Sequence, residues 1–212
     1  MIVECVTVGL FQMNAYVVGC EKTREGALID VGAEVDRILA AASRHGLRLT
    51  KIINTHGHLD HVEGVQEAKE RLGVPFYLHR GDLPHLRSLA EKARSFGLPA
   101  PWTPEVDGFL EEGDAVSVGE LTFRVLCTPG HSEGGVTFYR EGAAFVGDAL
   151  FAGAVGRTDL PGSSPTQLLC SIREKLLALP PETVAYPGPQ TTIGREAETN
   201  PFLLPGAERL FL

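Results

Sequence analysis

The sequence lacks both a long apolar run and a concentration of positive charge. Its 19 Lys and Arg residues are outnumbered by 27 Asp and Glu residues, which gives a formal net charge of −8. Nonspecific nucleic-acid binding needs clustered basic residues, so the composition argues against a nucleic-acid partner. No apolar run approaches membrane-spanning length, and residues 1–5 lack the basic and apolar segments of a signal peptide. We therefore expect a cytoplasmic protein without a membrane partner.

Cysteine is also scarce. The four cysteines are far apart and include no Cys-x-x-Cys pair: Cys5, Cys20, Cys127 and Cys170. This spacing favours reduced, mostly buried thiols over a disulfide framework. A chain of 212 residues can bury a sizeable core as one domain, so we predict a single domain over residues 1–212. The sequence does not indicate an oligomeric state.

The pattern of apolar residues predicts strands and helices in both halves of the chain. Helical periodicity covers residues 34–45, 65–72 and 165–179, and residues 98–108 form a Pro-rich surface loop. Strand runs with inserted helices predict an α/β protein of two packed sheets with helices on the outer faces. The expected strands cover 2–8, 15–18, 27–31, 51–54, 75–79, 115–118, 121–127, 136–139, 143–146 and 183–186.

Three of the seven histidines stand in one short segment, His56-Gly57-His58-Leu59-Asp60-His61. Imidazole and carboxylate together suit zinc, manganese and iron(II). Residues two apart in an extended segment point the same way, so His56 and His58 can share one ion. A turn at Asp60 and His61 would aim both at a neighbouring point, which allows two ions about 3.5–4 Å apart, as in two-metal hydrolases.

The alternative is an exposed histidine tract without function. Here the segment is internal, follows the strand-like run 51–54 and precedes a helical pattern. This order is typical of a site at the carboxyl end of a strand. We therefore predict a metal site.

Two distant residues are candidates to complete this site. His131 follows the strand 121–127 after a Pro-Gly turn, where an incidental histidine is the alternative. Asp148 follows the apolar strand 143–146, where a carboxylate needs hydrogen bonds or a cation because bare burial is costly. We expect the other histidines to lie elsewhere: His45 at helix carbonyls, and His79 and His85 on the surface. Trp102 either lines a cleft or caps the core.

Four motifs, in this order along the chain, resemble the metallo-β-lactamase-fold superfamily. They are Thr55–His61, Pro129–Ser132, Gly147–Phe151 and Gly156–Asp159. Within this superfamily, the chain is similar to the short bacterial type of the glyoxalase II (hydroxyacylglutathione hydrolase) branch. Segments 191–196 and 200–203 are also similar to members of that branch. The resemblance implies a four-layer αββα sandwich of two mixed β-sheets with helices on the outer faces.

The resemblance also implies a set of metal ligands. It assigns His56, His58 and His131 to a first ion, Asp60 and His61 to a second ion, and Asp148 to a bridge between them. The implied ions are Zn2+ and/or Fe2+, with Mn2+ as a third option, and one or two of them are bound.

One ligand implied by the resemblance is missing. The family has a further histidine in a Pro-Gly-His-Gly-Pro loop, whereas this chain reads Tyr186-Pro187-Gly188-Pro189-Gln190, and no histidine follows His131. Gln190 offers only a neutral amide oxygen, a poor replacement for imidazole on zinc. Disturbing even a supporting group typically costs about 10–100-fold in metal affinity. We therefore expect the first site to be favoured and the second to be weakened.

The resemblance implies a metal-dependent hydrolase of small-molecule thioesters, such as S-lactoylglutathione. Asp60 would orient the nucleophile, Thr55 would support the site, and Arg157 is a candidate for substrate contact near its mouth. Two alternatives remain. One is a mononuclear iron persulfide dioxygenase that uses His56, His131 and Asp148, and the other is a non-catalytic metal-binding module.

Overall fold

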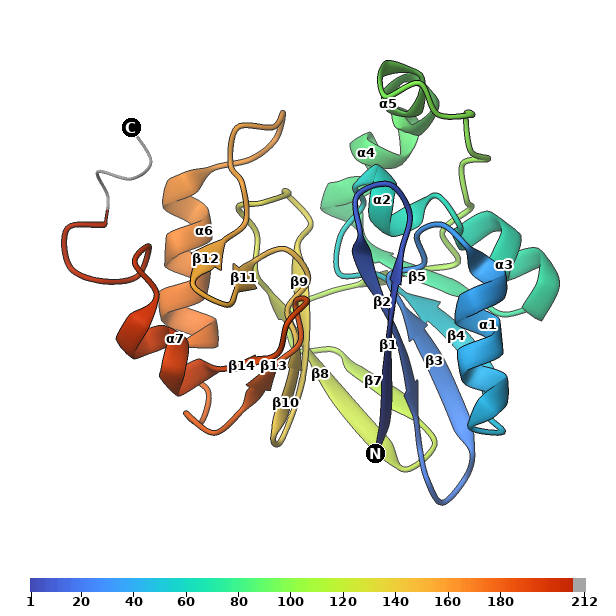
Figure 1. The fold of residues 1–212 in the computed structure, drawn as a ribbon, viewed down its shortest axis with the longest axis horizontal. Coiled ribbons are helices and arrows are strands. Elements are labelled where there is room, and N and C mark those ends of the chain that lie inside the picture. Colours follow the sequence, from blue (N-terminus) through green and yellow to red (C-terminus); the bar gives the residue numbers. More distant parts are fainter. Residues whose placement is uncertain (208–212) are drawn as a thin grey trace.

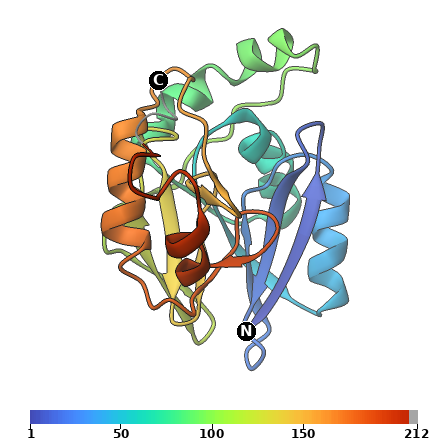
Figure 2. The ribbon, with the colours of Figure 1, turned by 60° about the vertical axis from the view of Figure 1, so that its left-hand side comes forward.

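Two six-stranded sheets pack face to face in the computed structural model, which describes residues 1–207 (Figure 1). The helices lie outside the two sheets. Figure 2 shows α1 beyond one sheet and α6 and α7 beyond the other. The predicted αββα sandwich of two mixed sheets is therefore confirmed. The predicted domain extends to residue 212, and its last five residues lie outside the described part of the chain.

The first sheet has the order β1-β2-β3-β4-β5-β6. Neighbours are antiparallel from β1 to β3 and parallel from β3 to β6. Ile29 pairs with Ile53, so β3 and β4 end side by side. Its strands are β1 (Ile2–Val8), β2 (Met13–Gly19), β3 (Glu25–Ile29), β4 (Arg48–Ile53), β5 (Phe76–His79) and β6 (Gly108–Leu110).

The second sheet has the order β14-β13-β10-β9-β8-β7. Only β10 and β13 are parallel neighbours within it. Its strands are β7 (Ala115–Val118), β8 (Leu121–Cys127), β9 (Val136–Arg140), β10 (Ala143–Phe145), β13 (Val184–Ala185) and β14 (Thr191–Thr192). A small separate sheet pairs β11 (Leu150–Phe151) with β12 (Ala154–Val155).

The helices follow the predicted pattern in part. Those of the first half are α1 (Val35–Arg44), α2 (Leu59–Val62), α3 (Val65–Leu72), the 3-10 turn Arg80–Asp82, α4 (Leu83–Arg87) and α5 (Leu89–Ser95). Those of the second half are α6 (Pro165–Ser171), a π-helical turn at Ile172–Leu176, and α7 (Ile193–Thr199). The single helix predicted over 165–179 is thus divided, and α2, α4, α5 and α7 were not predicted. Within residues 1–207, none of the helices has the length and apolar character needed to cross a membrane.

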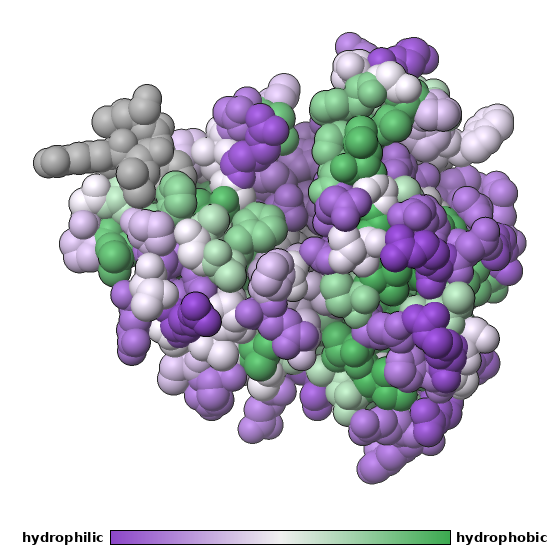
Figure 3. Space-filling model, viewed as in Figure 1, coloured by the Kyte–Doolittle hydropathy of each residue, from purple (hydrophilic) through white to green (hydrophobic). Residues whose placement is uncertain are grey.

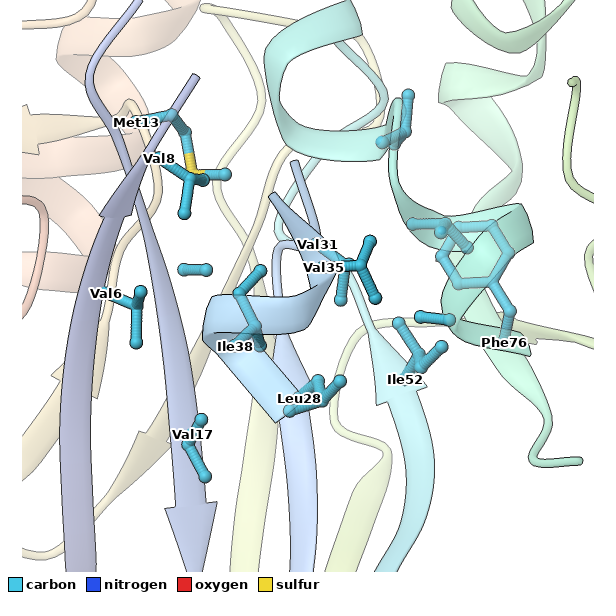
Figure 4. Packing of buried hydrophobic residues seen from close by; sticks show 14 of the residues in the cluster. Val6, Val8, Met13, Val17, Leu28, Val31, Val35, Ile38, Ile52 and Phe76 are labelled. Atoms are coloured by element: carbon cyan, nitrogen blue, oxygen red, sulfur yellow. The ribbon is translucent and has the colours of Figure 1, made fainter. Parts of the chain in front are cut away.

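Helix α1 shows why its sequence is helical and which face it buries. Val35, Ile38, Ala41 and Ala42 are buried, and they recur with the period of a helix. Ile38 packs in the cluster that also holds Leu28 from the first sheet (Figure 4). The helix predicted over 34–45 is one residue shorter at each end, because Glu34 adopts the left-handed conformation at its start.

Successive side chains along a strand point into two different hydrophobic cores. In β2, Ala15 and Val17 belong to the cluster under the helices, whereas Tyr16 and Val18 belong to the cluster between the sheets. This alternation follows from the two-residue period of a strand. The sandwich therefore needs strands that are apolar on both faces, and the sequence supplies them.

Replacing Phe138 by alanine should lower the free energy of unfolding by about 3–5 kcal/mol. Its side chain is fully buried between the sheets, so the neighbouring side chains can fill the space only in part. Denaturant unfolding at equal metal loading measures the change. Trp102→Ala is the control, because that residue is 83% exposed, and the change should stay below about 0.5 kcal/mol. Equal losses for both variants would contradict this assignment of the core.

One minor prediction was wrong, and one alternative that the sequence left open is decided. Of the four cysteines, all free, only Cys20 is buried, while Cys5 and Cys170 are exposed. The exposure of Trp102 also shows that it does not cap the core. Neither the cysteines nor Trp102 are among the residues of the site described below.

Candidate metal centre

Loops that follow three strands meet at one end of the two sheets. β4, β8 and β10 all run toward the upper end of the molecule in Figure 1. The segment 56–61 follows β4, His131 follows β8, and Asp148 follows β10. The predicted site residues are therefore brought together from both sheets.

The first group of ligand atoms comes from His56, His58 and His131. One nitrogen of each ring lies within 4.8 Å of the others, and all three side chains are buried. Nδ1 of His58 is only 2.9 Å from Nε2 of His131. His131 Nδ1 lies 2.9 Å from the carbonyl oxygen of Arg157, to which it donates when it carries the ring proton, leaving the Nε2 lone pair facing this group.

These histidines fit a divalent cation. Nε2 of His56 is buried and has no hydrogen-bond partner among the described residues, an arrangement that is costly unless something binds in the centre. Burial, reinforced by the neighbouring histidines, holds the pKa of His56 well below its usual range. The same causes lower the pKa of His58 to about 2. Neutral imidazole is the form that binds metals.

The second group comes from Asp60, His61 and Asp148. His61 Nε2 lies 3.3 Å from Asp148 Oδ1 and 3.8 Å from Asp60 Oδ2. The other oxygen of Asp148 lies 3.6 Å from His131 Nε2, so this carboxylate stands between the two groups. Burial raises the pKa of Asp148, but His61 and His131 outweigh it and bring it to about 2. Burial lowers the pKa of His61, and Asp148, Asp60 and Asp30 together raise it well above its usual range.

Asp30 is a site residue that the sequence reasoning missed. Its Oδ1 accepts from the Thr55 backbone N–H at 2.7 Å, and its Oδ2 accepts from Thr55 Oγ1 at 2.6 Å. Oδ2 also lies 3.0 Å from His61 Nδ1. Asp30 has a φ of 58°, so β3 ends at Ile29 rather than at residue 31 as predicted. The argument used for Asp148, a carboxylate at the end of a buried strand, would have found it.

Thr55 lies behind the ligands rather than facing a substrate. It is buried, and its Oγ1 is 3.1 Å from His56 Nδ1. Gly147 packs directly on it: a Cβ at Gly147 would come within 2.3 Å of Thr55 Oγ1, and the φ of Gly147 is +51°. Only glycine therefore fits at this close approach between the loop of Asp148 and the histidine segment.

Replacing Asp30 by asparagine should weaken metal binding by about 10–100-fold, as expected for a group that supports ligands. An amide has one acceptor oxygen and no charge, so it cannot hold both Thr55 donors and also face His61. Competition with a chromophoric chelator measures the affinity. The control is Asp36→Asn, whose side chain is 87% exposed and pairs with Arg71. Unchanged affinity in the Asp30 variant would refute the supporting role.

A second buried carboxylate ties the loops of the first group together. Asp82 accepts from Gly57 N–H at 2.7 Å, Ser132 Oγ at 2.9 Å and Gly134 N–H at 2.6 Å. The segment with His56 and His58 is thereby linked to the loop with His131. Nothing in the sequence around Asp82 indicated this, because its partners lie 25 to 52 positions away.

Of the remaining histidines, His85 differs most from expectation. His85 is buried, not on the surface, and its ring centre lies 4.5 Å from that of His58. His45 ends α1, and its backbone N–H donates to the Ala42 carbonyl at 3.2 Å, while its side chain pairs through Nε2 with Glu4 Oε2 at 2.6 Å. His79 is half-buried, and its Nδ1 accepts from Gly81 N–H.

A cleft of about 280 Å³ opens onto both groups. Its polar wall includes Asp60, Lys92 and Arg157, and the Arg157 guanidinium makes two 2.7 Å hydrogen bonds to Asp159. Phe11 and Phe96 form an exposed aromatic edge, with ring centres 5.0 Å apart. Figure 3 shows hydrophobic surface near the tip of the β1–β2 hairpin, across a hollow from a hydrophilic projection.

The C-terminal loop that lacks a histidine lies next to β2. A Cβ at Gly188 would be 3.0 Å from Asn14 Nδ2. The second group thus keeps Asp60, His61 and Asp148, as the sequence suggested, and no histidine follows His131 that could join them.

Comparison with known proteins identifies the family. Residues 8–188 match the family described as the Metallo-beta-lactamase superfamily. The hydroxyacylglutathione hydrolase GloC of Haemophilus influenzae is 36% identical over 96% of this chain and 98% of its own length.

Three solved structures share the fold and have sequence identities of 30% to 46% with this chain. TTHA1623, in a di-iron-bound form, is 46% identical over 95% of this chain and all of its own, with a TM-score of 0.86. BLEG-1, a B3 metallo-beta-lactamase, is 36% identical over 95% of this chain and 99% of its own, with a TM-score of 0.88. ETHE1 from Myxococcus xanthus is 30% identical over this whole chain and 88% of its own, with a TM-score of 0.84. Because such different names share one fold, the fold alone does not specify the substrate.

Proposed function

The chain belongs to the metallo-beta-lactamase superfamily, whose members are mostly hydrolytic metalloenzymes, and we propose that it hydrolyses S-lactoylglutathione or a related glutathione thioester. The observation that carries the proposal is the convergence of three buried histidines and a carboxylate at an open cleft. The likeness to a hydroxyacylglutathione hydrolase supports the choice of a thioester.

The proposed metal ions are Zn2+ and/or Fe2+, with Mn2+ as a third option. His56, His58 and His131 would hold the first ion, Asp60 and His61 would contribute to a second, and Asp148 would bridge them. Such ions supply Lewis acidity, which lowers the pKa of water and polarises a carbonyl oxygen. That chemistry suits acyl transfer to water.

The side chains around the ions have separate tasks in this proposal. Asp60 lines the cleft, where its carboxylate can accept a hydrogen bond from the attacking water and direct the water toward the thioester carbonyl. Asp30 and Thr55 keep the ligands in place from behind. The thiolate leaves without much acid assistance, because a thiol has a pKa of about 8.5. Arg157 lies in the wall of the cleft and is proposed to contact the substrate.

A second candidate is an iron-dependent persulfide dioxygenase. Two histidines and one carboxylate, here His56, His131 and Asp148, are the ligand set of non-haem iron oxygenases, and this set does not need the second group. The likeness to ETHE1 favours this alternative.

One set of measurements separates the candidates. The purified protein is analysed for zinc, iron and manganese, and then assayed for S-lactoylglutathione hydrolysis and for oxygen uptake with glutathione persulfide. Thioester hydrolysis without oxygen uptake supports the main proposal, and the reverse result replaces it with the dioxygenase. Weak, substoichiometric metal with no turnover in either assay would identify a non-catalytic metal-binding module.

A further inference from the structure

The cleft continues into a side cavity of about 460 Å³. Lys92, Ser95 and Pro161 line both spaces, so they mark the passage between them. His85, Glu91 and Glu133 also line the side cavity. A substrate bound over the metal ligands can therefore extend past Lys92 into a second, more polar space.

Lys92 makes no ion pair with any of the described residues, although the charges of Asp82 and Asp60 act on it from farther away. Its Nζ donates to His85 Nδ1 at 3.0 Å, and no carboxylate among residues 1–207 lies within ion-pair distance of it. The side chain is half-buried, and burial lowers its pKa. An ammonium has three donors, and His85 accepts only one of them. Lys92 is thus a partly desolvated cation that a carboxylate in the passage would satisfy.

His85 holds Lys92 in this position. Because its Nδ1 accepts from Lys92, the ring proton of the neutral imidazole is on Nε2, which lies 3.9 Å from Asp82 Oδ1. Asp82 is fully buried and fixed by its three hydrogen bonds. The 3.9 Å separation is too long for a hydrogen bond, so Asp82 acts on His85 only through its charge, and the bond to His85 Nδ1 is what positions Lys92 in the wall.

The side cavity also presents negative charge. Glu91 and Glu133 stand in the same wall as Lys92. A purely anionic group would be repelled by these glutamates, whereas a neutral group would leave Lys92 without a partner. A group that carries both an ammonium and a carboxylate complements both charges.

We propose that the side cavity binds the α-amino acid end of the substrate's thiol, with the carboxylate on Lys92 and the ammonium on Glu133. The proposal rests on the proposed thioesterase function, in which the thiol is glutathione, whose γ-glutamyl end is an α-amino acid. Lys92 and Glu133 then determine which thiol is accepted, while the metal ligands determine the reaction.

Binding of S-methylglutathione tests the proposal without turnover, because this probe has no thioester and no free thiol. Calorimetry on the zinc-loaded protein should show binding that Lys92→Gln weakens by about tenfold or more, the value of one hydrogen bond to a charged group. Lys92→Arg should restore most of it. The matched control is Arg94→Gln, which removes the same charge from an exposed position of the same helix and should bind like the wild type.

The ammonium is tested with S-methyl-N-acetylglutathione, in which it is blocked. The wild type should bind this probe more weakly than S-methylglutathione, and Glu133→Gln should remove the difference. In S-lactoylglutathione hydrolysis, Lys92→Gln should raise KM and leave kcat nearly unchanged.

The outcomes separate this proposal from the proposed function. If S-lactoylglutathione is not hydrolysed but S-methylglutathione still binds through Lys92, the function is wrong and the binding site stands. If hydrolysis occurs and Lys92→Gln changes neither KM nor probe affinity, the binding site is wrong. A wild-type protein that fails to bind S-methylglutathione also overturns it.

Discussion

Replacing His131 by alanine should remove the metal ion from the first group and reduce thioester hydrolysis by more than about 100-fold. Loss of a supporting group alone costs about 10–100-fold in metal affinity or activity, and His131 is a direct ligand in this proposal. Its Nε2 lies 2.9 Å from His58 Nδ1 and 3.6 Å from Asp148 Oδ2, so it contributes to the centre of the site. Elemental analysis and initial rates on S-lactoylglutathione measure the two losses.

His79→Ala is the matched control for this variant. His79 ends β5, is half-buried, and bonds only to the backbone of the turn that follows. It should change metal content and rate by less than twofold. If the His131 variant keeps its metal and its rate, or if the His79 variant loses them equally, the ligand assignment fails.

Inserting His-Gly between Gly188 and Pro189 should raise the metal content from about one to about two ions per chain and increase hydrolysis by at least about tenfold, since it restores a direct ligand. The flanks already match the loop that the family uses, and the existing second group offers Asp60, His61 and Asp148. Stoichiometry is measured by elemental analysis after dialysis against zinc, and the rate is measured on S-lactoylglutathione.

An Ala-Gly insertion at the same position separates the ligand from the length of the loop. It lengthens the chain equally but offers no imidazole, so metal content and rate should stay at the level of the original protein. If His-Gly changes neither quantity, the missing histidine is not what limits the second group. If both insertions change them alike, loop length rather than ligation is responsible.

Much of the fold could be predicted from local sequence. Helix α3 and strand β8 lie at the predicted residues, 65–72 and 121–127, because their apolar residues follow the period of a helix and, over most of its length, of a strand. Helices α4 and α5 were missed because each is short and the two follow one another at Ser88, so neither presents a long periodic pattern. Strand β6 has three residues and depends on pairing with β5.

The sequence by itself determined the metal-binding motif and the two-sheet architecture, because both are local patterns. The motif lies within His56 to His61, and the alternation of apolar residues that marks a strand lies within each strand. Only the tertiary structure decided which polar groups support the motif. Asp30 reaches Thr55 because β3 and β4 end level in the sheet, and Asp82 reaches Gly134 across 52 positions. The physical reason is that local periodicity is a property of one segment, whereas hydrogen bonds between loops depend on strand register and chain packing that no single segment contains.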